Sequence, residues 1–145
     1  MWLYNNNKIK SIQDMPEGTV GFIYKITHIK SGKFYIGKKQ LYSTVTKKLT
    51  KKEILEQKGP GRKSTKKQVI SESNWLVYTG SSKKLNKVIE EEGRDKFKFE
   101  IISFCSTKRQ LTYREVKFQI LNECLEKPEA TFNENILGKF FPEDI

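Results

Sequence analysis

The stretch over residues 19–39 has the pattern of two antiparallel strands joined by a tight turn, and it constrains the fold most. Residues 20–27 place side chains on alternate faces, which is the period of two that a β-strand requires. Ser31-Gly32 supplies turn chemistry, and the residues after it form the return strand. An odd index sum near 59 would set Tyr24 directly opposite Tyr35. Such a pair either only packs or belongs to a site.

Three further elements are expected downstream of the hairpin. The capping residues and apolar spacing predict a helix from residue 81 or 82 to residue 93, a strand over 96–104 and a long helix over 107–125. Residues 1–18 are interpreted as a short edge strand or a cover for the sheet. The predicted class is therefore α+β, with a small antiparallel three-stranded sheet flanked by helices.

On the long helix, the expected buried stripe consists of Leu111, Phe118, Leu121 and Leu125. Glu115 falls at the edge of this stripe, where its carboxylate would be partly desolvated. Desolvation of a carboxylate is costly unless a partner offsets it. The position on the helix leaves two partners open, a lysine or arginine in a salt bridge and a bound cation.

Most of the net positive charge of the chain, +9 of +11, lies in residues 38–68, which hold eleven lysines and arginines against two glutamates. We expect a basic loop with one short helix that begins at a capping box formed by Thr50 and Glu53. Phosphate groups would relieve the mutual repulsion of so many cations. The predicted DNA-binding residues are Lys47, Lys48, Lys51, Lys52, Lys58, Arg62, Lys63, Lys66 and Lys67.

Composition narrows the class of protein. A chain of 145 residues is expected to form one domain, and its net charge of +11 indicates a polyanionic partner, of which nucleic acid is the commonest. An acidic protein or a membrane surface is the alternative. No apolar run would span a bilayer and no signal peptide is recognised. Two cysteines are too few for a disulfide framework, so a reducing cytoplasm is the expected location. Cys105 and Cys124 form no metal motif, and the single histidine, His28, is expected in an exposed turn.

The hairpin resembles the signature of the GIY-YIG nuclease superfamily. It carries FIY at 22–24 and YIG at 35–37, with ten residues between the two tyrosines. Phe22 replaces the first glycine of that signature, and Gly21 lies one place early. The order of elements resembles this domain from about residue 19 to residue 136, with a basic insertion at about 40–75. The segments YTGSSKKL and GRDKF look like the small phage-type branch, which includes free-standing homing endonucleases.

The resemblance implies roles for individual residues. Tyr24 and Tyr35 match the tyrosines of the two motifs, and Tyr24 would activate the attacking water. Glu115 matches the glutamate that holds a single divalent ion, Mg²⁺ (or Mn²⁺), and Asn133 matches a late asparagine that shapes the site.

The family's further cation, usually an arginine, has no clear match, because Val45 stands ten residues beyond Tyr35. Lys38, Lys39 and Arg62 are the candidates. Lys39 is favoured because residues 35, 37 and 39 share one face of an extended strand.

By this resemblance the chain would be a metal-dependent DNA endonuclease that hydrolyses phosphodiester bonds without a covalent intermediate. Its substrate would be double-stranded DNA, on which the protein could act as an oligomer. Its location would be the host cytoplasm if a phage encodes it. The alternative is a catalytically inactive nucleic-acid-binding module that uses the basic insertion. A third hypothesis is an interaction protein whose basic segment docks an acidic partner.

Overall fold

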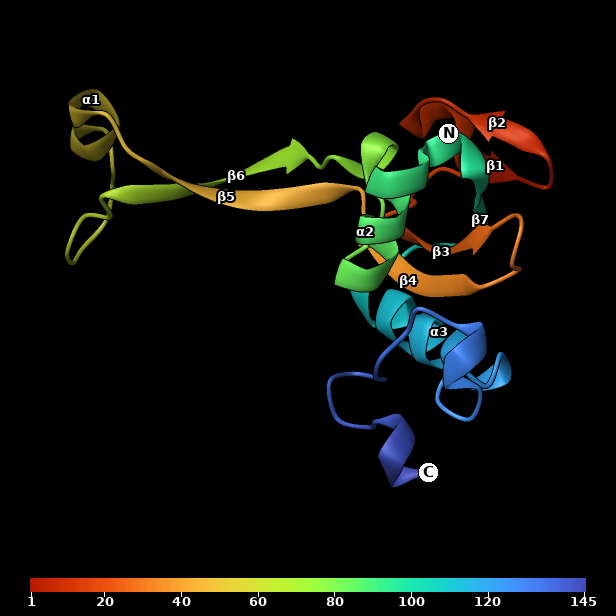
Figure 1. Cartoon of the computed structure of the whole chain (residues 1–145). Helices are drawn as coiled ribbons and strands as arrows, with labels where there is room; N and C mark the ends of the chain where they lie inside the picture. The colour runs from red at the N-terminus through yellow and green to blue at the C-terminus, as the bar shows by residue number, and fades with distance from the viewer. The chain divides into compact units, whose positions relative to one another are not determined.

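A computed structural model describes residues 1–145, which divide into two compact units, residues 1–41 with 74–145 and residues 42–73. The first unit contains a five-stranded sheet in the order β2-β1-β7-β3-β4 (Figure 1). Its strands are β1 (Trp2–Tyr4), β2 (Asn7–Ile9), β3 (Gly21–His28), β4 (Phe34–Gln40) and β7 (Phe97–Cys105).

The α+β class is confirmed, but the three-stranded sheet was wrong. Strand β3 pairs antiparallel with both β7 and β4, as expected, and β1 adds to β7 in the parallel direction. The first residues form a hairpin in which Trp2 pairs with Ile9. The Trp2 side chain is fully buried, and its indole N–H donates to the Trp75 carbonyl oxygen at 2.8 Å. A buried, hydrogen-bonded tryptophan at the margin of the sheet holds the extra strands in place.

The register of the β3–β4 hairpin differs from the expected one. Tyr24 lies opposite Gly37 and Ile26 lies opposite Tyr35, so the index sum is 61 instead of 59. The turn explains the shift, because the His28 N–H donates to the Lys33 carbonyl oxygen at 2.8 Å. With residues 28 and 33 closing the turn, each β3 residue pairs with a β4 residue two positions later than expected. The two tyrosines still share a face of the sheet, but they are diagonal neighbours.

A β-bulge interrupts the pairing of β3 with β7. Ile23 pairs with Ser103 and Tyr24 with Ile101, so Ile102 is an extra residue on β7. The extra residue reverses the alternation of side chains beyond it. As a result Cys105 packs in the same apolar cluster as Ile23.

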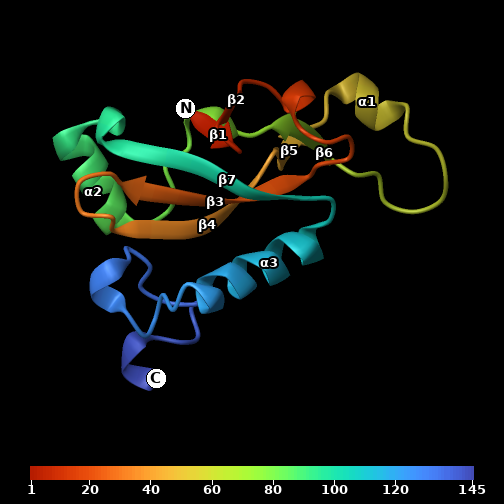
Figure 2. The ribbon, with the colours of Figure 1, turned by 90° about the vertical axis from the view of Figure 1, so that its right-hand side faces the viewer.

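Two helices cover the two faces of this sheet. Helix α2 (Lys83–Glu92) packs Leu85 and Ile89 into the cluster that contains Phe22 and Tyr24. Helix α3 (Lys108–Leu121) packs Leu111 against Ile23 and Ile36, along the face seen in Figure 2. Both begin at the expected caps, because Ser82 accepts from the Leu85 N–H at 3.2 Å and Thr107 from the Gln110 N–H at 3.0 Å. Short 3₁₀ helices connect the elements: η1 (Ile12–Asp14), η2 (Trp75–Val77), η3 (Arg94–Lys96), η4 (Pro128–Ala130) and η5 (Pro142–Asp144).

The predicted buried stripe of α3 was partly wrong. Leu111 is buried, but Leu121 is 64% exposed, and Leu125 is buried from the turn that follows the helix. The inner line of the helix runs instead through Leu111, Glu115 and Gln119, four residues apart. Gln119 takes an inner place because its amide reaches the backbone of β4.

The second unit is a β-ribbon, so the expectation of a basic loop was wrong. Strands β5 (Tyr42–Lys48) and β6 (Lys66–Glu72) pair antiparallel over seven residue pairs. The short helix α1 (Lys51–Leu55) lies at the end of the ribbon (Figure 1). It begins at the predicted capping box, in which Glu53 N–H donates to Thr50 Oγ1 and Thr50 N–H to Glu53 Oε1, both at 3.2 Å. No helix of the chain has the length and apolar character of a membrane span.

Candidate active site

The two tyrosines of the hairpin lie at the centre of the candidate site. The rings of Tyr24 and Tyr35 have centroids 6.1 Å apart and planes 38° apart. A third ring, that of Tyr78, stands edge-on to Tyr24 with centroids 6.1 Å apart. The Tyr35 hydroxyl shares a hydrogen bond of 3.0 Å with the Ser81 hydroxyl. Tyr24 is only 1% exposed, so its phenol is enclosed by the neighbouring aromatic side chains.

Two glycines make room for these rings. A Cβ at position 37 would lie 2.5 Å from the Tyr24 hydroxyl oxygen and 2.9 Å from a Tyr35 ring carbon. A Cβ at Gly80 would lie 3.2 Å from Tyr35 and 3.3 Å from the Tyr24 hydroxyl, and Gly80 has a φ of +87°. Gly37 is therefore needed for space, and Gly80 for both space and backbone conformation.

The surroundings keep both phenols protonated at neutral pH. Burial raises the pKa of Tyr24 well above its ordinary value, and the phenols of Tyr35 and Tyr78 and the Glu115 carboxylate add to the effect. Burial also raises the pKa of Tyr35, against the opposing hydrogen bond from Ser81. Glu115 lines the same cleft as Tyr35, and its negative charge raises the pKa of both phenols.

Glu115 is a poorly compensated carboxylate. Its side chain is 17% exposed, and its ion-pair partner is Lys38, whose Nζ lies 4.0 Å from Oε1. That ammonium group also donates to Thr112 Oγ1 at 2.9 Å. Burial raises the pKa of Glu115 although Lys38 opposes the shift. One desolvated carboxylate with room around it fits Mg²⁺, which is bound through one or two carboxylates and keeps several waters.

The side-chain amide of Asn133 binds the backbone of β4 through both its oxygen and its nitrogen. Its Oδ1 accepts from the Ile36 N–H at 2.9 Å, and its Nδ2 donates to the Ile36 carbonyl oxygen at 2.8 Å. Gln119 Nε2 donates to the same carbonyl oxygen at 3.0 Å. Together the two amides satisfy the peptide groups of Ile36, between Tyr35 and Gly37. Their effect is to fix the edge strand that carries Tyr35.

A cleft of about 500 Å³ joins these parts. It brings together the predicted site residues Tyr35, Glu115 and Asn133, whereas Tyr24 is buried against Tyr35 and does not line the cleft. The residues that line it are Tyr35, Ser81, Ser82, Lys83, Glu115, Gln119, Phe132, Asn133, Glu134, Asn135 and Leu137. It is open, polar and large enough for a phosphate group with hydrated metal.

The candidate cations occupy different places. Lys38 lies beside Glu115 on the face that α3 covers, whereas Lys39 places its Nζ 4.1 Å from the centroid of the Tyr78 ring. Burial lowers the pKa of Lys39. Lys38 is thus the lysine beside Glu115, and Lys39 is the lysine that contacts the Tyr78 ring. Arg62 is an exposed residue of the second unit.

All the predicted DNA-binding residues lie in the second unit and are exposed. In the ribbon, Lys47 pairs across the strands with Lys67, and Lys48 with Lys66. Like charges directly opposite each other destabilise a strand pair. Lys67 is compensated by Glu53, whose Oε2 lies 2.6 Å from its Nζ, and Lys52 lies 3.9 Å from the Glu56 carboxylate.

Sequence reasoning missed four residues of the site. Gln119 lies one helical turn after Glu115, and that spacing was the available signal. Tyr78 and Ser81 lie in the segment between the ribbon and α2, where no periodicity marks them. Thr112 is recognised only from its contact with Lys38.

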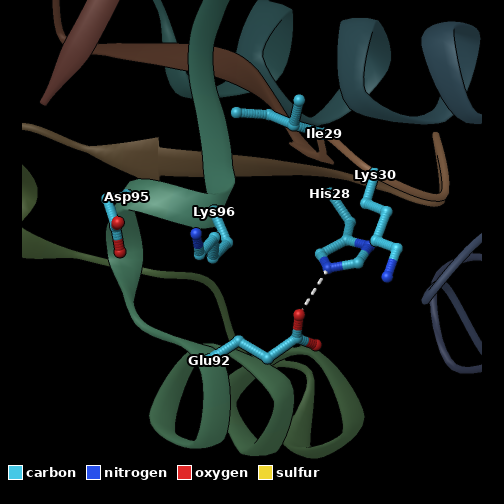
Figure 3. A pocket seen from close by; sticks show the side chains of 6 residues that line it. All are labelled: His28, Ile29, Lys30, Glu92, Asp95 and Lys96. Carbon is cyan, nitrogen blue, oxygen red and sulfur yellow. Dashed lines mark hydrogen bonds and ion pairs between the residues drawn. The ribbon is translucent and has the colours of Figure 1, made fainter.

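His28 is not the exposed turn residue that the sequence suggested. It is the last residue of β3 and is 9% exposed. Its Nδ1 is hydrogen-bonded to Ser31 Oγ at 2.7 Å. Its Nε2 is hydrogen-bonded to Glu92 Oε1 at 3.0 Å, as Figure 3 shows. His28 and Glu92 line a second cleft of about 450 Å³, together with Ile29, Lys30, Asp95 and Lys96. The histidine there ties the hairpin turn to the end of α2.

Comparison with known proteins gives one match. A family model described as "Putative endonuclease segE, GIY-YIG domain" matches residues 2–136. No curated protein and no solved structure matches the chain.

Proposed function

The chain belongs to the SegE-type GIY-YIG endonuclease domain family, and on that basis we propose that it is a metal-dependent DNA endonuclease that hydrolyses phosphodiester bonds in the cleft of Tyr35 and Glu115. The observation that carries the proposal is the meeting of residues from distant parts of the chain. Tyr35 comes from β4, Glu115 from α3 and Asn133 from the segment after it, and all three line one cleft.

Glu115 is the proposed metal ligand. Its desolvated carboxylate, with Lys38 at 4.0 Å, would gain a strong counter-charge from a divalent ion, and the open cleft leaves space for water and phosphate oxygens. A bound Mg²⁺ or Mn²⁺ would supply Lewis-acid polarisation of the phosphate and stabilisation of the leaving oxygen. The carboxylate would thereby fix where the scissile phosphate lies.

The tyrosines divide the work on the nucleophile. In this proposal Tyr24 accepts the proton of the attacking water, and Tyr35 orients the water or the phosphate through its hydroxyl, which Ser81 holds at 3.0 Å. Tyr24 acts only in its phenolate form. Because burial raises the pKa of Tyr24, that form is scarce in the free protein at neutral pH. The activity should therefore increase with pH.

Two lysines are proposed to share the place of the family's arginine. Lys38 would neutralise charge next to Glu115 and the phosphate, and Lys39 would act on the aromatic face of the strand. A neighbouring ammonium group lowers the pKa of a phenol, which favours the reactive form of Tyr24. Arg62 stays a third candidate, on the second unit.

The proposal includes a biological setting. A free-standing, phage-encoded enzyme of the homing type, acting on double-stranded DNA in the host cytoplasm, would need this chemistry and a basic DNA-binding surface. Sequencing the cut ends of a substrate library tests this part. Cuts at one recurrent position would support a homing-type enzyme, and scattered cuts would contradict it.

The test of the activity itself is nicking of supercoiled plasmid with Mg²⁺ and with EDTA. Open-circle product should appear with Mg²⁺ alone, and the Glu115→Gln variant should produce none. Glu123→Gln is the matched control, because Glu123 is an exposed carboxylate paired with Lys127 outside the cleft. DNA binding without any nicking would instead identify an inactive binding module.

A further inference from the structure

The ribbon of the second unit has two unlike faces. Its register places Tyr42 with Glu72, Thr44 with Ile70, Thr46 with Gln68, and Lys48 with Lys66 on one face. We call this the even face, since its β5 and β6 residues carry even numbers. The other, odd face contains Ser43 with Ser71, Val45 with Val69, and Lys47 with Lys67.

Charge separates these faces further. On the odd face Lys67 is compensated by Glu53 at 2.6 Å. On the even face Lys48 and Lys66 stand directly opposite each other, and neither side chain takes part in an ion pair. Two uncompensated ammonium groups on one rung destabilise the free ribbon. An anionic ligand on the even face would remove that penalty.

The ribbon is also built to stay in shape without a core. The Gln57 side chain joins the Ser64 backbone through two hydrogen bonds of 2.6 and 2.7 Å, and Ser64 Oγ donates to the Lys66 carbonyl oxygen at 2.7 Å. These bonds close the segment beyond α1 onto the start of β6. An arm that is ordered before it binds loses less conformational entropy on binding.

The dimensions fit one groove of DNA. A two-stranded β-ribbon enters the major groove, which is about 12 Å wide, and not the minor groove of about 6 Å. A seven-residue strand extends about 20 Å, which is long enough to cross the major groove. Gln and Thr side chains hydrogen-bond base edges there, and apolar groups contact the thymine methyl. From the α1 end the even face offers Lys48 with Lys66, Thr46 with Gln68 and Thr44 with Ile70. The last pair, Tyr42 with Glu72, puts the one carboxylate of this face at the end farthest from the two lysines.

From this geometry we infer that the ribbon over residues 42–72 docks in the major groove of double-stranded DNA through its even face. Lys48 and Lys66 contact phosphates, and Thr46 and Gln68 face the base edges. The inference rests on the proposed function, since it gives the nuclease its DNA-docking arm, and it adds the groove, the face and the residues.

The first test measures binding to a duplex in EDTA, where no cleavage occurs, over a range of salt concentrations. The double variant Lys48→Gln/Lys66→Gln should weaken binding about tenfold or more and lower the salt slope by about 2. The matched control, Lys47→Gln/Lys67→Gln, removes the same charge from the odd face and should have a clearly smaller effect. Equal effects of both pairs would overturn the choice of face. Circular dichroism confirms that each variant keeps its strands.

The second test identifies the groove. A duplex whose cytosines carry a bulky C5 substituent presents the same phosphates, but its major groove is filled. The unmodified protein should bind this duplex at least tenfold more weakly than the plain duplex, and the Gln68→Ala variant should discriminate less. Equal affinity for both duplexes, or equal affinity for single-stranded DNA, would overturn the inference.

These results are separable from failure of the proposed function. If nicking with Mg²⁺ proceeds while ribbon variants bind as well as the unmodified protein, only the ribbon inference fails. If binding follows the ribbon variants but nicking is absent, only the nuclease proposal fails.

Discussion

Gly37 lies directly opposite Tyr24 in the β3–β4 pair, and a methyl group at position 37 would come within 2.5 Å of the Tyr24 hydroxyl oxygen. The Tyr24 phenol of the first motif thus packs directly against the Gly37 backbone of the second motif. The two motifs are linked by contact as well as by function.

Gly37→Ala should therefore displace the Tyr24 phenol, lower the thermal midpoint and strongly reduce nicking. Adding Tyr24→Phe removes the closest clashing atom, so the double variant should regain part of the lost stability but no activity. Thermal unfolding of the four proteins forms a double-mutant cycle. Additive losses of stability would mean that the two residues do not press on each other.

Glu115→Gln should stabilise the metal-free protein while abolishing nicking. Because burial raises the pKa of Glu115 in the folded state, its stabilising contribution is present at low pH and lost as pH rises through that pKa. The variant keeps a neutral side chain, so its advantage in thermal midpoint should be smallest at acidic pH and should grow as the pH rises through the raised pKa of Glu115.

Mg²⁺ should raise the midpoint of the unmodified protein at pH 7 and leave that of Glu115→Gln unchanged. Equal Mg²⁺ shifts in both proteins would place the ion elsewhere.

Single-turnover nicking by the unmodified protein should rise about tenfold per pH unit and show no plateau below about pH 9, as expected for a base with a raised pKa. Tyr24→Phe should eliminate this pH-dependent rate, with binding unchanged. Tyr35→Phe, which loses only an orienting hydroxyl, should keep the slope at a lower rate. A plateau near neutral pH would remove Tyr24 as the proton acceptor.

Lys38 and Lys39 should fail in different ways. Lys38→Gln removes the ion-pair partner of Glu115, so the pKa of that carboxyl should rise further and more Mg²⁺ should be needed for half-maximal rate. Lys39 lies against Tyr78 and not beside Glu115, so the nicking rate of Lys39→Gln should fall without a change in Mg²⁺ requirement. Titrating Mg²⁺ in nicking assays separates the two, and identical titration curves would contradict this division.

Asn133→Leu should destabilise the fold by about 1–3 kcal/mol, because the buried Ile36 N–H loses its acceptor. Gln119→Leu is the matched comparison. It should cost less, since Asn133 still donates to the Ile36 carbonyl oxygen after the loss of Gln119. Urea unfolding of both variants checks the order, and a larger loss in Gln119→Leu would reverse the roles of the two amides.

Local rules recovered much of this chain. The capping residues Thr50, Ser82 and Thr107 begin the helices where side-chain chemistry predicts, because a cap acts within a few residues. The spacing of the two tyrosine motifs, together with the order of the later elements, was sufficient to recognise the family. Errors arose where distant partners decide, as at Leu121, which is exposed because the inner line of α3 is occupied by Glu115 and Gln119.

Alternation and spacing alone established the β-hairpin, the caps and the positions of two phenols and one acid along the chain. Packing decided the rest: the pairing of Tyr24 with Gly37, the bulge at Ile102 and the approach of Glu115 to the phenols. Periodicity predicts which face of its element a residue occupies. Strand register and the packing of a helix on a strand depend instead on contacts between segments far apart in sequence. A catalytic cleft consists of such contacts, and so it appears only when the chain is folded.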